Sequence, residues 1–320
     1  MSRSLQVAVP VANKLCCSKL PERFSKTDRC RRREKFAVGC IRSLGSWLVR
    51  PMPPPRQMEN AMRSSLITAT LLAGTCLVTV ARADTVAALV GDASLAHVDT
   101  AAKKVTKTVT ITGIGGSVLG IDVRPADGML YAVISDGSVV TIDPMSGKAT
   151  AKSKLDTTLA AGTAATVDFN PVADRLRIIG SDGTNLRANV DDGKVTKDGQ
   201  LKFAETDAMK GKTPKVMAGA YTNAFKGSKE TVLFDIDASG ALLKQAPPND
   251  GILNTVGMLG MSGDAVAFDI LSDGQGGNQA WAMAGDTLYK VDLATGKGEM
   301  AAKIDGVSGK VRDIAILPKM

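Results

Sequence analysis

Hydrophobic and polar positions follow the same order several times along the chain. Each copy has an apolar run, a Gly-Asp or Ser-Asp-Gly turn, an alternating run and a closing Val-Asp or Ile-Asp. Four copies are clear and a fifth is degenerate: ALVGDASLAHVD (88–99), AVISDGSVVTID (132–143), IIGSDGTNLRANVD (178–191), AMAGDTLYKVD (282–292) and TVLFDIDASGALLKQ (231–245). Asp and Gly between β-prone runs are typical of tight hairpin turns, because both tolerate the positive φ that such turns need. The pattern predicts a repeated β-hairpin.

The spacing of the hairpins indicates the architecture. The turn aspartates are Asp92, Asp136, Asp182, Asp237 and Asp286, separated by 44, 46, 55 and 49 residues. A polar strand follows each clear hairpin, and a further strand precedes each unit: GIDVRP (120–125), TVDFNP (166–171), GAYTN (219–223), AFDIL (267–271) and RDIAIL (312–317). Four strands per unit of this length are typical of a propeller blade. We predict an all-β fold, a β-propeller of about five four-stranded blades within a single domain, 84–320.

The two ends of this domain predict how the ring closes. It begins with the later strands of a blade, 88–111, and ends with an isolated first strand, 312–317. Pairing of these N- and C-terminal strands would complete one blade and remove exposed sheet edges. Few aromatic residues are available, so we expect the packing between blades to be mostly aliphatic.

Several short motifs together are similar to the bacterial domain-of-unknown-function family 4394. They are GIDVRP (120–125), DFNP (168–171), DRLR (174–177), NLR (185–187), AYTN (220–223), PPNDG (247–251) and LNTVG (253–257). The resemblance covers roughly 88–317 and implies a secreted or envelope-located propeller-like domain. It implies no established activity, and so assigns no catalytic residue. The PPNDG motif is either a ligand-binding loop or a wide connection between strands.

The basic character of the chain belongs to its N-terminal part. The formal charge of +8 suggests an anionic partner such as nucleic acid. Residues 1–83, however, hold 15 of the 40 Lys and Arg and only 4 of the 32 Asp and Glu. The remaining chain is slightly acidic, which argues against nucleic acid as a partner.

Residues 58–83 have the features of a secretory signal peptide. The segment starts at Met58, carries Arg63, runs apolar from Leu66 to Val80 and ends in Ala-Arg-Ala. We expect cleavage after Ala83, a periplasmic or secreted protein, and no stable membrane span afterwards.

The segment before this signal, 1–57, is a basic prefix that we expect to be unstructured. Our interpretation is that translation starts at Met58 or Met62, so that the prefix is not made. A twin-arginine signal at Arg31-Arg32 and a lipid anchor at Cys76 are the alternatives. All five cysteines lie within 1–83, so we expect no disulfide in the exported domain.

Aspartates recur in the first strand of four units, at Asp122, Asp168, Asp269 and Asp313. First strands line the central channel of a propeller, so these residues predict a ring of carboxylates. Hard cations prefer oxygen ligands, which makes Ca²⁺ or Mg²⁺ a candidate occupant. The alternative, which repetition from blade to blade favours, is structural: the carboxylates accept backbone N–H groups or pair with Arg124 and Arg312. We therefore expect no cofactor, with Ca²⁺ as the alternative.

Polar residues near these strands are candidates for ligand binding. Arg124 and Asn170 follow the aspartates by two residues and share their face. The hairpin at 174–193 concentrates three of the five arginines of the exported domain, and guanidinium groups suit carboxylate or phosphate. The candidates are Arg124, Asn170, Arg175, Arg177, Arg187, Tyr221 and Asn223. For the three hairpin arginines, ion pairs within the scaffold are the alternative that we favour.

Several classes of enzyme are excluded by composition. His97 is the one histidine, in a position that other units fill with Thr or Lys. Catalytic triads and Cys-His pairs need a positioned imidazole base, which such a replaceable strand position does not indicate, and a zinc site needs several His or Cys ligands. We therefore predict an exported, non-catalytic propeller, expected to be a monomer, that binds an unknown protein, polymer or small ligand. The alternative is a Ca²⁺-dependent hydrolase or lactonase built around the aspartate ring.

Overall fold

The computed structural model describes residues 84–261 and 266–318. The expected prefix (1–57), the signal peptide (58–83) and Cys76 lie outside the described residues. The described part contains 21 β-strands and one short 3-10 helix, η1 (Pro248–Asp250). No described helix has the length and apolar character that a membrane crossing needs.

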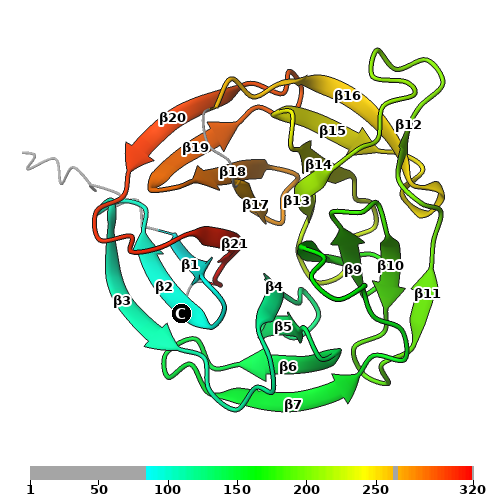
Figure 1. Ribbon diagram of the computed structural model, residues 1–320. Helices are drawn as coiled ribbons and strands as arrows, with labels where there is room; N and C mark the ends of the chain where they lie inside the picture. Colours follow the sequence, from blue (N-terminus) through cyan, green and yellow to red (C-terminus); the bar gives the residue numbers. More distant parts are fainter. Residues whose placement is uncertain (1–83, 262–265, 319–320) are drawn as a thin grey trace, which may run out of the picture. The chain divides into compact units, whose positions relative to one another are not determined.

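The strands form five sheets around one axis, and Figure 1 looks along this axis. Blade 1 comprises β4 (Val118–Val123), β5 (Leu130–Ile134), β6 (Ser138–Ile142) and β7 (Ala149–Lys154). Blade 2 comprises β8 (Ala165–Asn170), β9 (Arg175–Gly180), β10 (Asn185–Ala188) and β11 (Val195–Lys197). Blade 3 comprises β13 (Val216–Tyr221), β14 (Leu233–Asp237), β15 (Ala241–Gln245) and β16 (Ile252–Met258). Blade 4 comprises β17 (Val266–Ser272), β18 (Asn278–Ala284), β19 (Thr287–Val291) and β20 (Gly298–Lys303). Blade 5 comprises β21 (Val311–Ile316), β1 (Thr85–Val90), β2 (Ser94–Asp99) and β3 (Lys104–Thr110).

This arrangement confirms the predicted five-bladed propeller. Blade 3 differs from the prediction by one strand, because β12 (Lys202–Phe203) pairs in parallel with β16 at its outer edge. The extra strand lies in the longest interval between turn aspartates, from Asp182 to Asp237.

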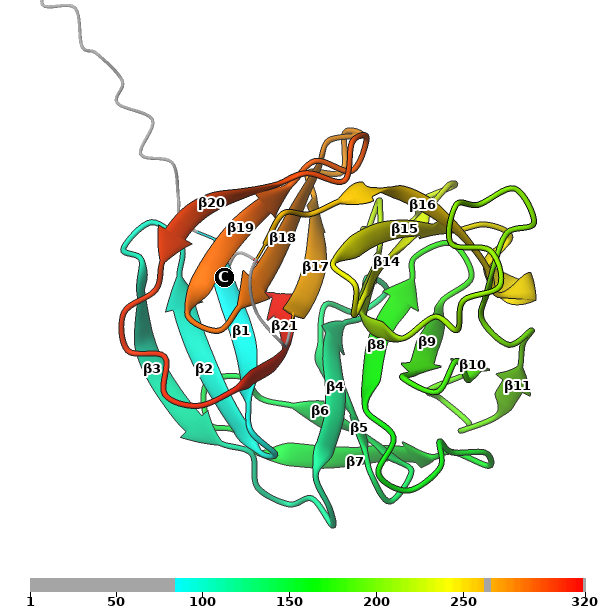
Figure 2. The same cartoon turned by 45° about the horizontal axis from the view of Figure 1, so that its top comes forward.

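Blade 5 closes the ring in the predicted way. β1 pairs in antiparallel orientation with β21, which places Leu89 opposite Asp313 and Val86 opposite Ile316. Figures 1 and 2 both show β21, in red, between the axis and β1. The innermost strands β4, β8, β13, β17 and β21 contact one another in this order around the axis.

The repeated aspartates form the hairpin turns. Asp136 Oδ1 accepts the Ser138 N–H at 2.8 Å, and the intervening Gly137 has a φ of 86°. The closing aspartates cap the next turn in the same way, as where Asp143 Oδ1 accepts the Met145 N–H at 2.8 Å. An aspartate that caps the backbone two residues further on fixes a tight turn, which explains why the sequence repeats it.

The hydrophobic core is divided among the five interfaces between neighbouring blades. Each interface holds one cluster of buried side chains, and most of these are Val, Ile, Leu and Ala. Between blades 1 and 2, the rings of Tyr131 and Phe169 meet edge to face, with centroids 5.2 Å apart. The mostly aliphatic packing expected from the sequence is confirmed.

Candidate functional site

Buried aspartates connect the innermost strands of neighbouring blades. Asp122 Oδ2 of blade 1 accepts the Phe169 N–H of blade 2 at 2.6 Å. Asp168 Oδ1 of blade 2 accepts the Tyr221 N–H of blade 3 at 2.9 Å. In the same way, Asp269 Oδ2 of blade 4 accepts the Ile316 N–H of blade 5 at 2.6 Å. Each carboxylate thus bonds a backbone group on the free edge of the next blade.

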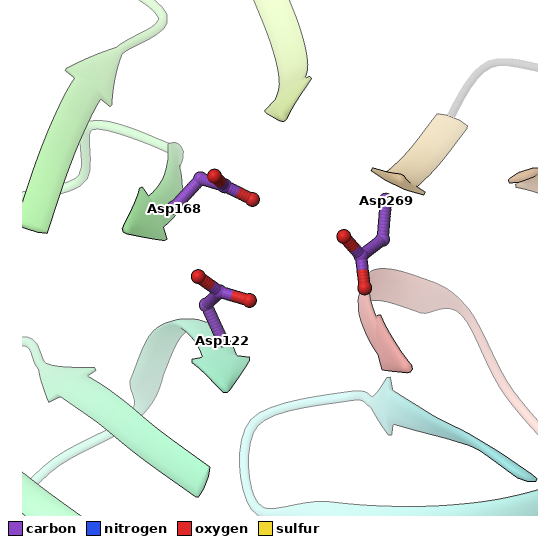
Figure 3. A group of neighbouring side chains, drawn as sticks. All are labelled: Asp122, Asp168 and Asp269. Atoms are coloured by element: carbon purple, nitrogen blue, oxygen red, sulfur yellow. The ribbon is translucent and has the colours of Figure 1, made fainter. Parts of the chain in front are cut away.

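Three of these aspartates form one cluster at the axis, which we call the axial cluster: Asp122, Asp168 and Asp269. Each offers a carboxylate oxygen, and these oxygens all lie within 4.8 Å of one another. Figure 3 shows the three side chains pointing toward one another from three different blades. All three residues are buried.

Asp313, the fourth predicted member of the ring, lies at a different height along the axis. Its Oδ2 accepts the N–H of Ile121, the residue before Asp122. Asp269 instead bonds Ile316, three residues beyond Asp313. By this register Ala315, and not Asp313, lies at the height of the axial cluster. Asp313 lies two residues earlier in β21, which is about 7 Å along the strand. The prediction that the first strands place all four carboxylates at one height is therefore wrong for Asp313.

Alanines occupy the other two positions at the height of the axial cluster. Ala220 of blade 3 precedes Tyr221, and Ala315 of blade 5 precedes Ile316. Where the preceding blade has alanine, the aspartate caps its own strand: Asp269 Oδ1 accepts the Ile270 N–H and Asp122 Oδ1 accepts the Val123 N–H, both at 2.6 Å. Backbone hydrogen bonding is thus one role of these carboxylates, as the structural alternative expected.

The buried position of the carboxylates disfavours their ionised forms. Burial raises the pKa of Asp122, Asp168 and Asp313, and it raises the pKa of Asp269 to about 6. The negative charges of neighbouring aspartates raise the pKa of Asp122 and Asp168 further, while backbone N–H groups oppose the shift. A bound cation would reverse this repulsion.

A pocket opens at the end of the axis where the innermost strands terminate, and we call it the axial pocket. Its volume is about 540 Å³, and Asp122 and Asp269 are part of its lining. Because both residues also belong to the axial cluster, the pocket leads to the carboxylates. Apolar lining comes from the same strand ends, among them Val123, Ile270 and Ile316.

Arg177, in the arginine-rich hairpin, is enclosed by partners. Its Nη1 donates to Asp198 Oδ2 at 2.6 Å and to Asn185 Oδ1 at 2.8 Å. Its Nε donates to the Tyr221 hydroxyl at 3.2 Å, and its Nη2 donates to Asn249 Oδ1 at 2.8 Å. The residue is 2% exposed. These contacts are those of a structural ion pair, and a role of Arg177 and Tyr221 in ligand binding stays a prediction.

Arg187 and the PPNDG motif both contact this buried ion pair or its neighbours. Arg187 donates from Nε and Nη2 to both oxygens of Asp198, at 2.6 and 2.9 Å. The motif forms the β15–β16 connection, and its Pro248 carbonyl and Asn249 side chain bond Asn185 and Arg177 of blade 2. The connection therefore fastens blade 3 to blade 2. Asp198, which joins two of the arginines, had no signal in the repeat pattern because it lies outside the repeated motif.

Arg124, Asn170 and Arg175 also have protein partners. The Arg124 guanidinium pairs with Asp174 and Asp191 of blade 2, with closest approaches of 2.6 and 2.9 Å. Asn170 Oδ1 accepts the N–H groups of the following turn. Arg175 donates to the Asp174 carbonyl at 2.9 Å. The structure brings none of the three into the axial cluster, so ligand binding by them stays a prediction.

Asn223 lies near the axial pocket, in the loop after β13. Its backbone N–H donates to Asn278 Oδ1 at 2.8 Å, and Asn278 Nδ2 donates back to Asn223 Oδ1 at 2.9 Å. This reciprocal pair joins the β13–β14 loop of blade 3 to the start of β18 in blade 4. His97, by contrast, is buried at the seam of blades 5 and 1, where its Nε2 lies 2.7 Å from the Pro144 carbonyl.

Asp235 is a buried carboxylate that the sequence analysis missed. It lies in β14, opposite Gly219, and is 0% exposed. Both of its oxygens lack a hydrogen-bond partner. Burial raises the pKa of Asp235 to about 8, although the nearby positive charge of Arg177 opposes the shift. The LFDID pattern alternates like its neighbours in sequence and so gives no sign that this position is enclosed.

Asp235 should make the protein less stable as the pH rises from 4 to 8. An unfolded aspartate ionises near pH 4, whereas Asp235 in the folded protein ionises near pH 8. The folded state binds the extra proton across this interval, so its stability falls with rising pH. Asp235→Asn cannot ionise in either state. Denaturant unfolding should show the variant gaining several kcal/mol relative to the wild type by pH 8, at about 1.4 kcal/mol per pKa unit.

The control for this experiment is Asp136→Asn, at an exposed turn. The backbone N–H of Ser138 lowers the pKa of Asp136, so this variant should show no such gain. Parallel stability curves for Asp235→Asn and the wild type would contradict the assignment.

Comparisons with known proteins place the chain in a family. Its fold is similar to that of a protein of unknown function from Bacteroides caccae, with 15% identity and a TM-score of 0.39 over 71% of this chain and 76% of that one. A second protein of unknown function, from Bacteroides thetaiotaomicron VPI-5482, is 17% identical with a TM-score of 0.43, over 72% of this chain and 59% of that one. A search of curated proteins found no match. The family model of the domain of unknown function DUF4394 matches residues 94–315, and the chain therefore belongs to this family.

Proposed function

We propose that the protein is an exported, non-catalytic binding module that receives a small ligand in the axial pocket. The observation that carries the proposal is the pocket itself, a cavity of about 540 Å³ at one end of the axis of a rigid ring. Its size is within the range of small-molecule sites, and its lining combines apolar side chains with a few polar groups, as such sites do.

A ligand screen tests this function. The chain 84–320 would be screened by thermal shift against amines, sugars, carboxylates and short peptides, and assayed for turnover of lactones, phosphoesters and glycans. We expect a ligand that stabilises the protein without turnover. Leu271→Lys, which places a long charged side chain in the axial pocket, should abolish the shift. Turnover of any of these substrates would remove the non-catalytic assignment.

Export is supported by the sequence of residues 58–83. N-terminal sequencing of the protein from its native source should begin at Asp84. A full-length chain in the cytoplasm would contradict export.

A second candidate function, a Ca²⁺-dependent hydrolase or lactonase, is favoured by the axial cluster. Ca²⁺ takes six to eight oxygen ligands, roughly 2.3–2.6 Å away, and three carboxylates within 4.8 Å of one another could supply several of them. In such an enzyme the cation would polarise a substrate carbonyl or phosphoryl oxygen in the adjoining axial pocket.

Calcium should stabilise the protein if this second candidate is correct. A site with a Kd of ~10 µM would add about 2.7 kcal/mol to the free energy of unfolding in 1 mM Ca²⁺, which corresponds to roughly 5–10 °C in Tm. Asp168→Asn should remove the effect. Asp313→Asn, which changes an aspartate outside the axial cluster, should retain it. Equal Tm values in Ca²⁺ and in excess chelator would argue against the hydrolase.

A further inference from the structure

The charged residues that line the axial pocket all have the same sign. They are Asp84, Asp122, Asp269 and Asp273, and no lysine, arginine or histidine is among the described lining residues. Arg124, which follows β4 at the pocket end, pairs with Asp174 and Asp191, and Arg312, at the opposite end of β21, pairs with Asp92. Within the described chain, backbone N–H groups are therefore the main groups that offset the negative charge of the axial cluster.

One oxygen of the axial cluster accepts no hydrogen bond from the described residues. Asp168 is 6% exposed, and only its Oδ1 is occupied, by the Tyr221 N–H. Figure 3 shows its carboxylate aimed at Asp122 and Asp269. Unlike the two oxygens of Asp235, this Oδ2 is not fully enclosed, so a donor that enters from outside can reach it.

The separation of the oxygens fits a primary ammonium group. Its three N–H donors point to tetrahedral corners, and with N–H···O distances of about 2.8 Å the three acceptors stand about 4.6 Å apart. The three carboxylate oxygens all lie within 4.8 Å of one another. An ammonium entering past Asp122 and Asp269 could donate to all three.

The rest of the pocket fits an apolar body attached to this ammonium. Beyond the aspartates, the lining includes Val123, Phe225, Ile270, Leu271, Ile316 and Leu317. A hydrated metal ion gains nothing from such walls, whereas a hydrocarbon chain gains roughly 25 cal/mol for each Å² that it buries. A volume of about 540 Å³ also exceeds what a single ion occupies.

We infer that the axial pocket binds a primary ammonium compound with an apolar body, its nitrogen held by the axial cluster. The inference rests on the proposed function and names the chemical class of its ligand. Desolvating an ammonium is costly unless carboxylates surround it, so a neutral or anionic analogue of the same shape lacks the feature that the pocket recognises.

The test uses n-hexylamine as the probe, with hexan-1-ol and hexanoate as its neutral and anionic analogues. The chain 84–320, whose ring closes within Thr85–Ile316, would be titrated by calorimetry in the presence of a chelator. Hexylamine should bind at least tenfold more tightly than either analogue.

Three variants test where hexylamine binds. Asp269→Asn should weaken the binding of hexylamine at least tenfold. Leu271→Lys should abolish this binding, because the new lysine supplies an ammonium group from the protein and leaves the hydrogen bonds between blades intact. Asp313→Asn is the matched control, since it alters the same kind of backbone bond outside the site, and it should leave the affinity unchanged.

The outcomes separate this inference from the proposed function. If hexanol or hexanoate binds as tightly as hexylamine, and Leu271→Lys blocks it, the ammonium class is wrong and the binding module stands. If hexylamine fails to bind while a compound of the ligand screen without an ammonium group binds, the same conclusion holds. If no compound binds, both are wrong. Hexylamine binding that survives both Asp269→Asn and Leu271→Lys would also overturn the assignment.

Discussion

A chain that ends at Gly309 should fail to form a soluble, folded propeller. The truncation removes β21, the innermost strand of blade 5, whose Val311, Ile314 and Ala315 side chains are buried. It exposes the backbone edge of β1 and deletes the bond from Asp313 to Ile121 of blade 1. Several kcal/mol should be lost, out of the roughly 5–15 kcal/mol that stabilises a typical domain. An exposed apolar edge strand also promotes aggregation.

Solubility, near-ultraviolet circular dichroism and thermal melting measure this loss. The matched control is the chain 84–317, which keeps β21 and lacks only the last three residues. It should melt like the chain 84–320. If the chain 84–309 is soluble and melts cooperatively within about 5 °C of the control, closure of the ring by β21 contributes little to stability.

Asp198→Ala should destabilise the protein by about 3–5 kcal/mol, the usual cost of removing one partner of a buried ion pair. The side chains of Arg177 and Asp198 are 2% and 5% exposed. Without the carboxylate, the buried guanidinium of Arg177 keeps only neutral acceptors: Asn185, Tyr221 and Asn249. The same carboxylate also holds Arg187, so one substitution leaves two cations without their counter-ion.

Denaturant unfolding of Asp198→Ala and Asp191→Ala would measure this effect. Asp191 also pairs with two basic residues, Arg124 and Lys152, but its side chain is 51% exposed. Exposed pairs contribute roughly 0–1 kcal/mol, so its loss should cost far less. Equal destabilisation by the two variants would show that the Arg177 ion pair is no more important than a surface pair.

The blades could be predicted from the sequence because their signals are local. The Asp-Gly turns, such as that at Asp136 and Gly137, lie between strands that pair within the same unit. The closure by 312–317 followed from the order of strands at the two ends. In each case the relevant residues belong to one blade, and comparing the repeated units with one another identifies its strands.

Contacts between blades could not be predicted in the same way. The height of Asp313 depends on how far β21 is shifted along β4 and β17, and a shift of two residues changes neither the alternation nor the face. Asp198 lies in a connection outside the repeat, and its partners come from β9 and β10. The burial of Asp235 depends on the absence of a side chain at Gly219, where a Cβ would come within 2.5 Å of its carboxylate.

The hydrogen bonds from aspartates and Thr166 to the next blade are unevenly distributed around the ring. Blades 2 and 3 are joined at two heights, by Asp168 to Tyr221 and by Thr166 to Gly219. Blade 3 has Ala218 and Ala220 at the corresponding positions of β13, so neither height supplies such a bond to blade 4. There the Asn223–Asn278 pair joins the loop after β13 to the start of β18 instead. Thermal fluctuations should therefore separate blades 3 and 4 before any other neighbours, and amide hydrogen exchange along the inner edges of β13 and β17 would report this local opening.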